Sequence, residues 1–447
     1  MSDSPSVPAQ PRAKLVFVNR YFHPDESATS RITSDLAFRL AQLGIDVSVV
    51  TSRQLYEDPR ANLPAFECAR GVNIHRVATA RLGRGNLVGR AVDYLSFHVA
   101  APAKLLGVLS AGDVVVAETD PPMISVVVSY AARLKRAHMV NWLQDLFPEV
   151  ATALGMSLGP AWLGKLLRGI RDHSLRRAVV NVVLGDRMRD QLIARQLDAR
   201  RIRVIPNWSD IRKITPLPTR QSRTRREQSL DDKFVIGYSG NLGRAHEFET
   251  LLGAARLLRQ DPRFAFLLTG AGAKVQALHR AVEADRLGNF HFMPLQPPEL
   301  LEDSLAASDV HVISLLPQLE GLIVPSKLYG ILAAGRPSVF IGAADGEVAG
   351  VIREHQCGIT VAVGDSARLA SELVSMFEAP ARLQAMGRNA RSLAESHYTA
   401  EHAAETWRQM LAGIAPTATN PTRDGAVALA GGARCRDEDP AARTSVT

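Results

Sequence analysis

The stretch FVIGYSGNLGRAHEFETLL, Phe234–Leu252, decides the fold, because a strand, a glycine turn and a helix follow one another in it without a break. Its β-branched and aromatic residues up to Tyr238 are typical of a buried strand. Gly240 and Gly243 then permit a tight turn, after which apolar residues recur at helical spacing. A strand that leads directly into a helix is the unit from which helix-covered parallel sheets are built.

The same unit recurs along almost the whole chain. Apolar runs before this stretch are KLVFVN (14–19), DVSVVT (46–51), DVVVAE (113–118), HMVNWL (138–143) and NVVLG (181–185), and those after it are FAFLLTG (264–270), FHFMPL (290–295), VHVISL (310–315), PSVFIG (337–342) and GITVAV (358–363). Helical segments separate these runs, which predicts an α/β fold with two doubly wound parallel sheets in tandem. A chain of 447 residues, 46% of them hydrophobic, is long enough for two such domains.

The segment KITPLPTRQSRTRREQSLDD (213–232) separates the two series of strands. It is rich in Pro, Ser, Thr and Arg and has no apolar periodicity, so it is predicted to be an exposed linker. The expected organisation is a disordered N-terminus (1–12), an N-terminal domain (13–210), the linker (211–232), a C-terminal domain (233–395), a C-terminal helix able to pack back on the N-terminal domain (396–415) and a disordered tail (416–447).

Composition narrows the class of protein. No apolar run approaches the roughly 20 residues that span a bilayer, and the first residues lack the apolar centre of a signal peptide, which predicts a cytoplasmic protein. The three cysteines are far apart and lack CxxC spacing, so no zinc site is expected. The strand ends also carry no His/Asp/Glu cluster, and we therefore expect chemistry without a metal.

The positive charge is concentrated in one region. Residues 160–213 contain 13 Lys and Arg against 5 Asp and Glu, a surplus that equals the net charge of +8 of the whole chain. Such a region can bind nucleic acid, an anionic membrane surface or a phosphorylated substrate, or it can be a solvated helix face.

Loops that follow strands carry the ligand site in open α/β sheets. The first such loop, NRYFHPDESATSRIT (19–33), has no glycine, which disfavours the GxGxxG turn of a dinucleotide-binding enzyme. It offers polar side chains instead, namely Asp25, Glu26, Ser27, Thr29 and Ser30, with Arg31 opening the helix. Thr29 or Ser30 could simply be a helix N-cap.

Two features in the second half predict anion binding. The Gly240–Gly243 turn opens a helix and is followed by Arg244. The run LIVPSK places Ser326 and an exposed-looking Lys327 at the start of another helix, whose first N–H groups lack partners. Two anion sites at neighbouring strand ends fit a diphosphate, so we expect Lys327 to grip phosphate.

The order of several segments resembles the family-four glycosyltransferases of bacterial polysaccharide synthesis. These segments are YFHPDESATSR, GIDVSVVTS, NWLQDLFPEVATALG, VIPNWSD, YSGNLGRAHEFETLL, LLTGAGA, PLQPPELLEDSLAASDVHVISL, GLIVPSKLYGILAAGRP and CGITVAVGD. The resemblance covers roughly Lys14 to Gly413. The branch that includes N-acetylfucosaminyl and colanic-acid glycosyltransferases is the most similar.

The resemblance implies a GT-B fold, with two facing Rossmann-like domains and the active site between them. It implies metal-independent transfer with retention of anomeric configuration, from a UDP- or GDP-linked sugar to a polyprenyl-diphosphate-linked or glycan acceptor in O-antigen, capsule or exopolysaccharide synthesis, and no nucleic-acid partner. It places the donor on Gly240, Asn241, Gly243, Arg244, Gly270, Glu320, Ser326 and Lys327. Of the catalytic residues that it implies, Arg244 and Lys327 clamp the diphosphate and Asp145 lies beside the transferred sugar. It also puts the acceptor on the N-terminal domain, where Asp25, Glu26, Ser27 and Arg31 are expected on the acceptor side, and Asn207 and Asp210 at the domain crossover.

The chain departs from the family pattern at two points. Gly330 stands where many members have the second glutamate of Glu-x7-Glu, and the position eight residues before it is Leu322. His246 replaces the lysine of the usual glycine-rich loop, and we expect it at the surface or at a helix start. Asp145 has an alternative role as N-cap of a helix near Pro148, and Glu149 is expected only as a favourable first-turn charge.

Two other functions stay open at this point. A nucleotide-sugar epimerase can share the fold, and a non-catalytic subunit could bind a nucleotide sugar without transferring it. Residues 81–110 and 162–179 read as basic, apolar helices, which are suited to an anionic bilayer unless they pack into the core. Because the resemblance implies a lipid-linked acceptor, peripheral association with the inner membrane face is expected.

Overall fold

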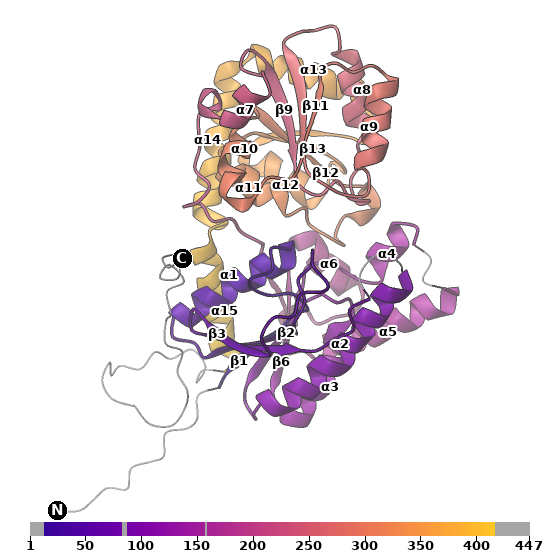
Figure 1. Ribbon diagram of the computed structural model, residues 1–447, viewed down its shortest axis with the longest axis vertical. Coiled ribbons are helices and arrows are strands. Elements are labelled where there is room, and N and C mark those ends of the chain that lie inside the picture. The colour runs from indigo at the N-terminus through magenta and orange to yellow at the C-terminus, as the bar shows by residue number, and fades with distance from the viewer. Residues whose placement is uncertain (1–12, 83–86, 157–158, 416–447) are drawn as a thin grey trace, which may run out of the picture.

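The computed structural model describes residues 13–82, 87–156 and 159–415, which form two α/β domains (Figure 1). The N-terminal domain holds an eight-stranded sheet of order β3-β4-β2-β1-β5-β6-β7-β8. Its strands are parallel except for β3, which pairs antiparallel with β4. The strands are β1 (Leu15–Val18), β2 (Val47–Ser52), β3 (Phe66–Ala69), β4 (Val72–Val77), β5 (Val114–Ala117), β6 (His138–Leu143), β7 (Val180–Val183) and β8 (Ile202–Val204).

Helices cover both faces of this sheet, because its central strands, such as β1, β2 and β5, are buried along their whole length. They are α1 (Ala28–Gln42), α2 (Leu87–Val108), α3 (Ile124–Lys135), α4 (Glu149–Ala153), α5 (Ala161–Arg177) and α6 (Asp186–Ala194). Leu15 and Phe17 of β1 face the core under α1, whereas Val16 and Val18 face the core under α2 and α3. None of the helices in the described part of the chain is both long and apolar enough to cross a membrane.

The C-terminal domain holds a six-stranded sheet of order β11-β10-β9-β12-β13-β14, which is parallel throughout. Its strands are β9 (Phe234–Ser239), β10 (Phe264–Thr269), β11 (Phe290–Met293), β12 (Val310–Ser314), β13 (Ser338–Ile341) and β14 (Gly358–Val361). Its helices are α8 (Glu249–Leu257), α9 (Val275–Ala284), α10 (Leu301–Ala306), α11 (Lys327–Ala333), α12 (Glu347–His355), α13 (Ser366–Glu378) and α14 (Pro380–His397). Both sheets have the doubly wound α/β architecture that the sequence predicted.

The segment 211–232 is held more firmly than a loose linker. It contains a short helix, α7 (Arg223–Glu227), and the buried guanidinium of Arg225 lies 3.0 Å from the Asp309 carboxylate. Arg225 also donates to the carbonyl oxygens of Leu230 and Ala307. The polar composition of this segment therefore reflects hydrogen bonds to the C-terminal domain as well as exposure to solvent.

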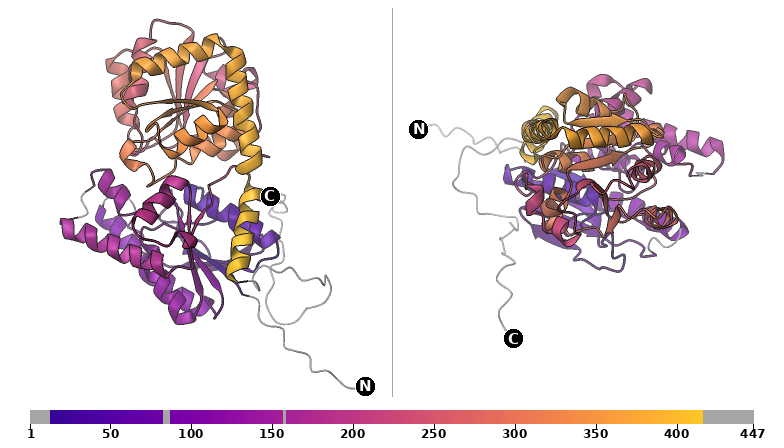
Figure 2. Two further views of the ribbon diagram at one scale, coloured as in Figure 1. Left: turned by 180° about the vertical axis from the view of Figure 1, so that it is seen from behind. Right: turned by 90° about the horizontal axis from the view of Figure 1, so that it is seen from above.

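The last helix, α15 (Ala400–Ile414), returns to the N-terminal domain and packs on α1 (Figure 2). Trp407 is fully buried there, with its ring centroid 5.0 Å from that of Trp142, which in turn stacks on Trp208. The backbone N–H of Ser209 donates to the carbonyl of Tyr398 at 3.0 Å. The segment that leaves the N-terminal domain and the segment that returns to it therefore run side by side.

The two domains touch through the loops at the carboxyl ends of their sheets. The loop after β6 and the loop after β12 form a β-bridge between Asp145 and Ile323, and the N–H of Leu146 donates to the carbonyl of Leu322 at 2.9 Å. Apolar side chains of both domains, including Leu146 and Leu319, belong to one buried cluster. The strand ends that carry ligand sites in such sheets therefore face each other.

Candidate active site

Two glycine loops meet at the carboxyl ends of β9 and β10. Gly240 has a φ of 126°, a conformation that residues with a side chain rarely adopt. A Cβ atom at Gly270 would lie 2.0 Å from the carbonyl oxygen of Gly240, so the two backbones are in direct contact there. A Cβ atom at Gly243 would lie 3.0 Å from the side-chain amide of the exposed Asn241. Turns of this kind let a phosphate approach the backbone closely.

Lys327, the first residue of α11, lies beside this turn. Its Nζ is 3.5 Å from the centroid of the Tyr238 ring, and a Cβ at Gly240 would lie 3.9 Å from it. The residue as a whole is partly exposed, but Nζ is shielded from solvent and has no hydrogen-bond partner among the described residues. Burial lowers the pKa of Lys327 well below its ordinary value. The expectation of an exposed lysine was wrong, because the stem runs inward and places the amine over the Tyr238 ring.

The start of α11 is less extensive than the sequence suggested. The helix is only 7 residues long, and its N-cap residue, the exposed Ser326, makes no side-chain capping hydrogen bond. Gly330 lies in its middle with open space beside it, since a Cβ there would meet only a methyl group of Leu305 at 3.8 Å. The absence of a glutamate at position 330 thus leaves room at this face of α11.

Two further side chains, those of Arg244 and His246, lie close to the glycine turn. Arg244 is exposed and makes no hydrogen bond or ion pair within the described ranges, so its guanidinium is free to meet an anion. The imidazole of His246 lies against the carbonyl of Ser314 rather than at the surface or at a helix start, because α8 begins only at Glu249. Burial and the nearby Lys327 lower the pKa of His246 to about 4, which keeps it neutral.

Lys274 is a cation that the sequence analysis missed. Its ammonium donates to the carbonyl oxygen of His246, which fixes the end of the glycine turn. Its backbone N–H donates to the carbonyl of Leu242 at 3.0 Å. The signal was present in TGAGAK, where a lysine follows the glycine loop of the neighbouring strand.

Glu320 lies between the donor loop and the N-terminus of α12. Its Oε2 accepts a hydrogen bond from the backbone N–H of Glu347 at 3.2 Å, while Oε1 is shielded and has no partner among the described residues. A Cβ at Gly346 would lie 2.3 Å from the Glu320 carboxylate, so a larger residue there would displace the carboxylate. Burial raises the pKa of Glu320. The carboxylate thus stabilises a helix end, with one oxygen left for a ligand.

Asp145 lies on the opposite side of the domain seam, in the loop after β6. The alternative role as a helix cap is excluded, because the N-cap residue of α4 is Pro148. Its Oδ1 is shielded from solvent and has no hydrogen-bond partner among the described residues. Burial, and then the charge of Asp120, raise the pKa of Asp145 to about 7. This carboxyl group is therefore partly ionised at neutral pH.

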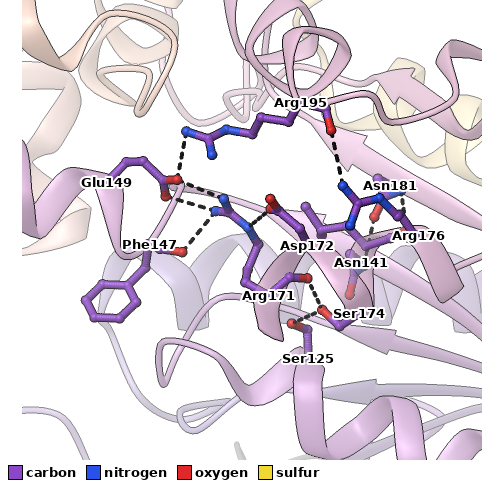
Figure 3. A network of polar contacts seen from close by, with 11 residues as sticks. Ser125, Asn141, Phe147, Glu149, Arg171, Asp172, Ser174, Arg176, Asn181 and Arg195 are labelled. Atoms are coloured by element: carbon purple, nitrogen blue, oxygen red, sulfur yellow. Dashed lines mark hydrogen bonds and ion pairs between the residues drawn. The ribbon is translucent and has the colours of Figure 1, made fainter. Parts of the chain in front are cut away.

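A buried polar network holds the loop that carries Asp145 (Figure 3). Arg171 donates to both oxygens of Glu149, at 2.9 and 3.0 Å, and to the carbonyl of Phe147 at 3.0 Å. Asp172 and Arg195 complete the network at 2.7 Å from Arg171 and Glu149, respectively. Glu149 is thus an anchor of the loop and does more than add a first-turn charge.

In the loop after β1 (19–33), the polar side chains predicted for the acceptor side are not all exposed. Asp25 is buried, and its carboxylate accepts hydrogen bonds from the N–H groups of Ser27 and Tyr56. Ser27 is the N-cap residue of α1 and makes no side-chain capping bond, while Ser30 donates to the Asp25 carbonyl. The carboxylate of Asp25 therefore shapes the loop.

Glu26 and Arg31, by contrast, are exposed. Of the side chains predicted for the acceptor side, these two are placed to meet a ligand that approaches this loop.

The crossover residues connect to the same region. The amide of Asn207 donates to the side chain of Gln144 at 2.9 Å, next to Asp145, while Asp210 accepts from the N–H of Arg212. The structure thus gathers the glycine turns and Lys327 in one domain and Asp145 in the other.

The sequence analysis missed Glu118, which is buried at the end of β5. The one signal in the sequence was that an acidic residue directly follows the apolar run VVVA.

Within residues 13–82, 87–156 and 159–415, the structure holds no group of three or more His, Cys, Asp or Glu side chains that could bind a metal ion.

Comparison with known proteins identifies the architecture. Residues 27–208 match a glycosyl transferase 4-like domain, and residues 233–379 match the glycosyl transferases group 1. The probable glycosyltransferase WbjE of Pseudomonas aeruginosa is 26% identical over 322 residues, which cover 71% of this chain and 79% of that protein. The putative colanic acid biosynthesis glycosyl transferase WcaI of Escherichia coli (strain K12) is 29% identical over 238 residues, 52% of this chain and 58% of its own.

A solved structure has the same fold. Crystalline HepE of Anabaena, in complex with UDP, aligns with a TM-score of 0.68 and 17% identity over 90% of this chain and 100% of its own. The resemblance found in the sequence is confirmed by the matched domains and by both relatives. The chain is a glycosyltransferase with the GT-B fold, built from a glycosyl transferase 4-like domain followed by a group 1 domain.

Proposed function

We propose that this enzyme transfers a sugar from a nucleoside-diphosphate sugar to a lipid-linked or glycan acceptor in cell-surface polysaccharide synthesis, with retention of anomeric configuration and without a metal. The observation that carries the proposal is the shielded amine of Lys327 beside the Gly240 turn, a cation without an anion. UDP is bound by the structural neighbour HepE, and colanic acid is named for the relative WcaI. Both favour a nucleotide-sugar donor and a polysaccharide product here.

The chemistry follows from charge. As the bond between the sugar and the diphosphate breaks, negative charge develops on the leaving phosphate. Lys327 and Arg244 supply positive charge there without reorganisation of solvent. The sugar becomes oxocarbenium-like at the same time, and the ionised form of Asp145 stabilises that positive charge from the facing domain.

The decisive experiment is an assay with UDP-, GDP- and dTDP-linked sugars and a polyprenyl-diphosphate-linked saccharide. Release of the nucleoside diphosphate together with a longer glycan supports sugar transfer. If NMR shows that the new glycosidic bond has the anomeric configuration of the donor, retention is supported as well. An epimerised nucleotide sugar without glycan growth would identify an epimerase, and binding without turnover would identify a non-catalytic subunit.

The acceptor-side domain presents an apolar, basic surface that fits a peripheral membrane role. Along α2, exposed apolar side chains recur at Val88, Val92, Leu95 and Val99, the last with 74% of its surface accessible. This spacing defines one face of the helix, opposite the buried side formed by Phe97, Ala101 and Leu105. The exposed face therefore does not pack into the core.

Two neighbouring helices extend this surface. α3 packs against both α2 and α5. On α5, Trp162, Leu166 and Ile170 are exposed at helical spacing, with Trp162 62% accessible. Exposed cations accompany them, including Arg133, Lys165 and Arg176. We name the surface formed by these residues of α2, α3 and α5 the amphipathic face.

An amphipathic face of this kind attracts anionic lipid by about 1 kcal/mol per Lys or Arg near the surface and inserts its apolar side chains shallowly. The amphipathic face supports the proposal that this is a cytoplasmic enzyme, which reaches a lipid-linked acceptor at the inner membrane face. Nucleic acid is a poor partner for this surface, because the apolar side chains of the amphipathic face make no favourable contact with a phosphate backbone.

A further inference from the structure

A small cavity lies at the carboxyl ends of β5 and β6, beside the loop that carries Asp145. Its volume is about 20 Å³, enough for one water molecule. Glu118 and Asp145 both line it, and each has one carboxyl oxygen, Oε1 and Oδ1, that is shielded from solvent and without a partner among the described residues. Two negative charges without partners in so small a space would repel each other strongly.

Thr33 lies between Glu118 and a backbone carbonyl, and its one hydroxyl hydrogen can go to only one of them. The hydroxyl of Thr33 lies 2.8 Å from the carbonyl oxygen of Thr29 and in close contact with Oε2 of Glu118. A hydroxyl group has one hydrogen, and a carbonyl oxygen can only accept. If Thr33 donates to Thr29, the hydrogen between Thr33 and Glu118 must belong to Glu118.

The surroundings of Glu118 agree with this assignment. The side chain is buried, and burial is the main reason why the pKa of Glu118 lies well above its ordinary value. The hydrogen bond with Thr33 lowers this pKa, and the charges of Asp120 and Asp145 raise it further. Arg171 also lines the cavity, but its guanidinium is engaged by Glu149 and Asp172. The charged groups that face Glu118 are therefore two carboxyl groups and one arginine already paired elsewhere.

We propose that Glu118 is a positioning residue that remains a neutral acid, donates its hydrogen to Thr33, and so leaves Asp145 as the one carboxyl group of the cavity that ionises to face the transferred sugar. This inference rests on the proposed function for the role of Asp145. The sugar-transfer step itself moves no proton to or from Glu118.

Infrared spectroscopy tests the protonation state directly and without an assay. The difference between wild type and Glu118→Gln at about pH 8, above the pKa of ordinary carboxyl groups, is expected to show the carbonyl stretch of a protonated acid. If only carboxylate bands change, Glu118 is ionised and the inference is overturned. Glu299→Gln, at an exposed position of the other domain, is the control and is expected to show carboxylate bands alone.

The pH dependence of turnover tests the positioning role. Glu118→Ala is expected to lose about tenfold or more in kcat, and Glu118→Gln, which keeps a donor toward Thr33, to restore most of it. The acid limb of the profile is expected to keep its midpoint in Glu118→Gln. If Glu118 were ionised, this variant would remove a negative neighbour from Asp145 and move the midpoint down by about one unit or more, which would refute the inference.

Asp145→Asn separates this inference from the proposed function. If Asp145→Asn transfers sugar as fast as the wild type, the role proposed for Asp145 fails, while the infrared band still decides the protonation of Glu118. If Asp145→Asn is inactive but the midpoint moves in Glu118→Gln, the proposed function stands and the present inference fails.

Discussion

The carboxylate of Glu347, in the C-terminal domain, accepts a hydrogen bond from the backbone N–H of Arg187 in the N-terminal domain at 2.9 Å. It thereby caps α6 across the domain seam, as an acidic side chain does at a helix N-terminus. The backbone N–H of Glu347 is in turn held by Glu320. The seam is thus linked to the donor loop through two carboxylates in series.

Gly185→Ala is expected to break this link, because a Cβ at position 185 would lie 2.3 Å from the Glu347 carboxyl carbon. The displaced carboxylate no longer caps α6, which costs about 1 kcal/mol, and the domains are expected to separate more readily. X-ray scattering in solution would show a larger radius of gyration. Gly350→Ala, in the same helix as Glu347 and with open space beside it, is the control that leaves the radius unchanged.

Loss of either cation at the glycine turn is expected to slow turnover severely while the fold is kept. Arg244→Ala and Lys327→Ala each remove a charge-assisted hydrogen bond to phosphate worth about 1.5–3 kcal/mol, or about 10- to 150-fold in rate. Steady-state kinetics and circular dichroism measure both effects. Arg259→Ala is the control, which is expected to keep normal turnover. It removes an equal charge from an exposed position before β10, at the amino ends of the strands. Near-normal rates in both site variants would contradict the donor-site assignment.

The buried amine of Lys327 also predicts how stability depends on pH. Its pKa is lowered in the folded protein, whereas the unfolded chain has the ordinary value of 10.5. Between the lowered pKa of the folded state and pH 10.5, the unfolded state therefore binds more protons, and in that range this group makes the free energy of unfolding rise with pH. Lys327→Met is expected to be more stable than wild type at neutral pH, by a margin that shrinks toward alkaline pH in urea titrations. A margin that does not change with pH would argue against a lowered pKa of Lys327.

Sugar transfer is expected to survive EDTA, since side-chain cations supply the charge that a metal would give to the leaving diphosphate. The assay is run with dialysed enzyme, with and without chelator, over the same time course. Activity that disappears with EDTA and returns with magnesium or manganese would overturn the metal-independent mechanism.

Liposomes that contain anionic lipid are expected to carry the protein upward in a density gradient at low salt and to release it at high salt, because salt screens the cations of the amphipathic face. A Val99→Ser, Trp162→Ser variant, which removes two exposed apolar side chains, is expected to float less. The variant Leu257→Ser alters an exposed apolar residue of the other domain and serves as control. Protein that stays at the bottom at both salt concentrations would exclude direct attraction to lipid.

The sequence predicted both sheets because each strand is a short apolar run bounded by turns, a local signal. It also predicted the neighbourhood of Gly240 and Lys327, since carboxyl ends of parallel strands meet at one edge. It could not predict that the amine of Lys327 is shielded by Tyr238, nor that Glu149 is paired with Arg171. Those partners are distant in sequence. The sequence around a charged residue at the start of a helix is the same whether the side chain contacts water or a buried ring.

The return of α15 to the N-terminal domain has a consequence for biosynthesis. Trp407 belongs to a core whose other aromatic members, among them Phe17 and Trp142, are made earlier in translation. The whole C-terminal domain leaves the ribosome before that core can close. The first domain to be synthesised is therefore the last to be completed, and a nascent chain that stops before Ala400 exposes an apolar groove on α1 and the sheet beneath it.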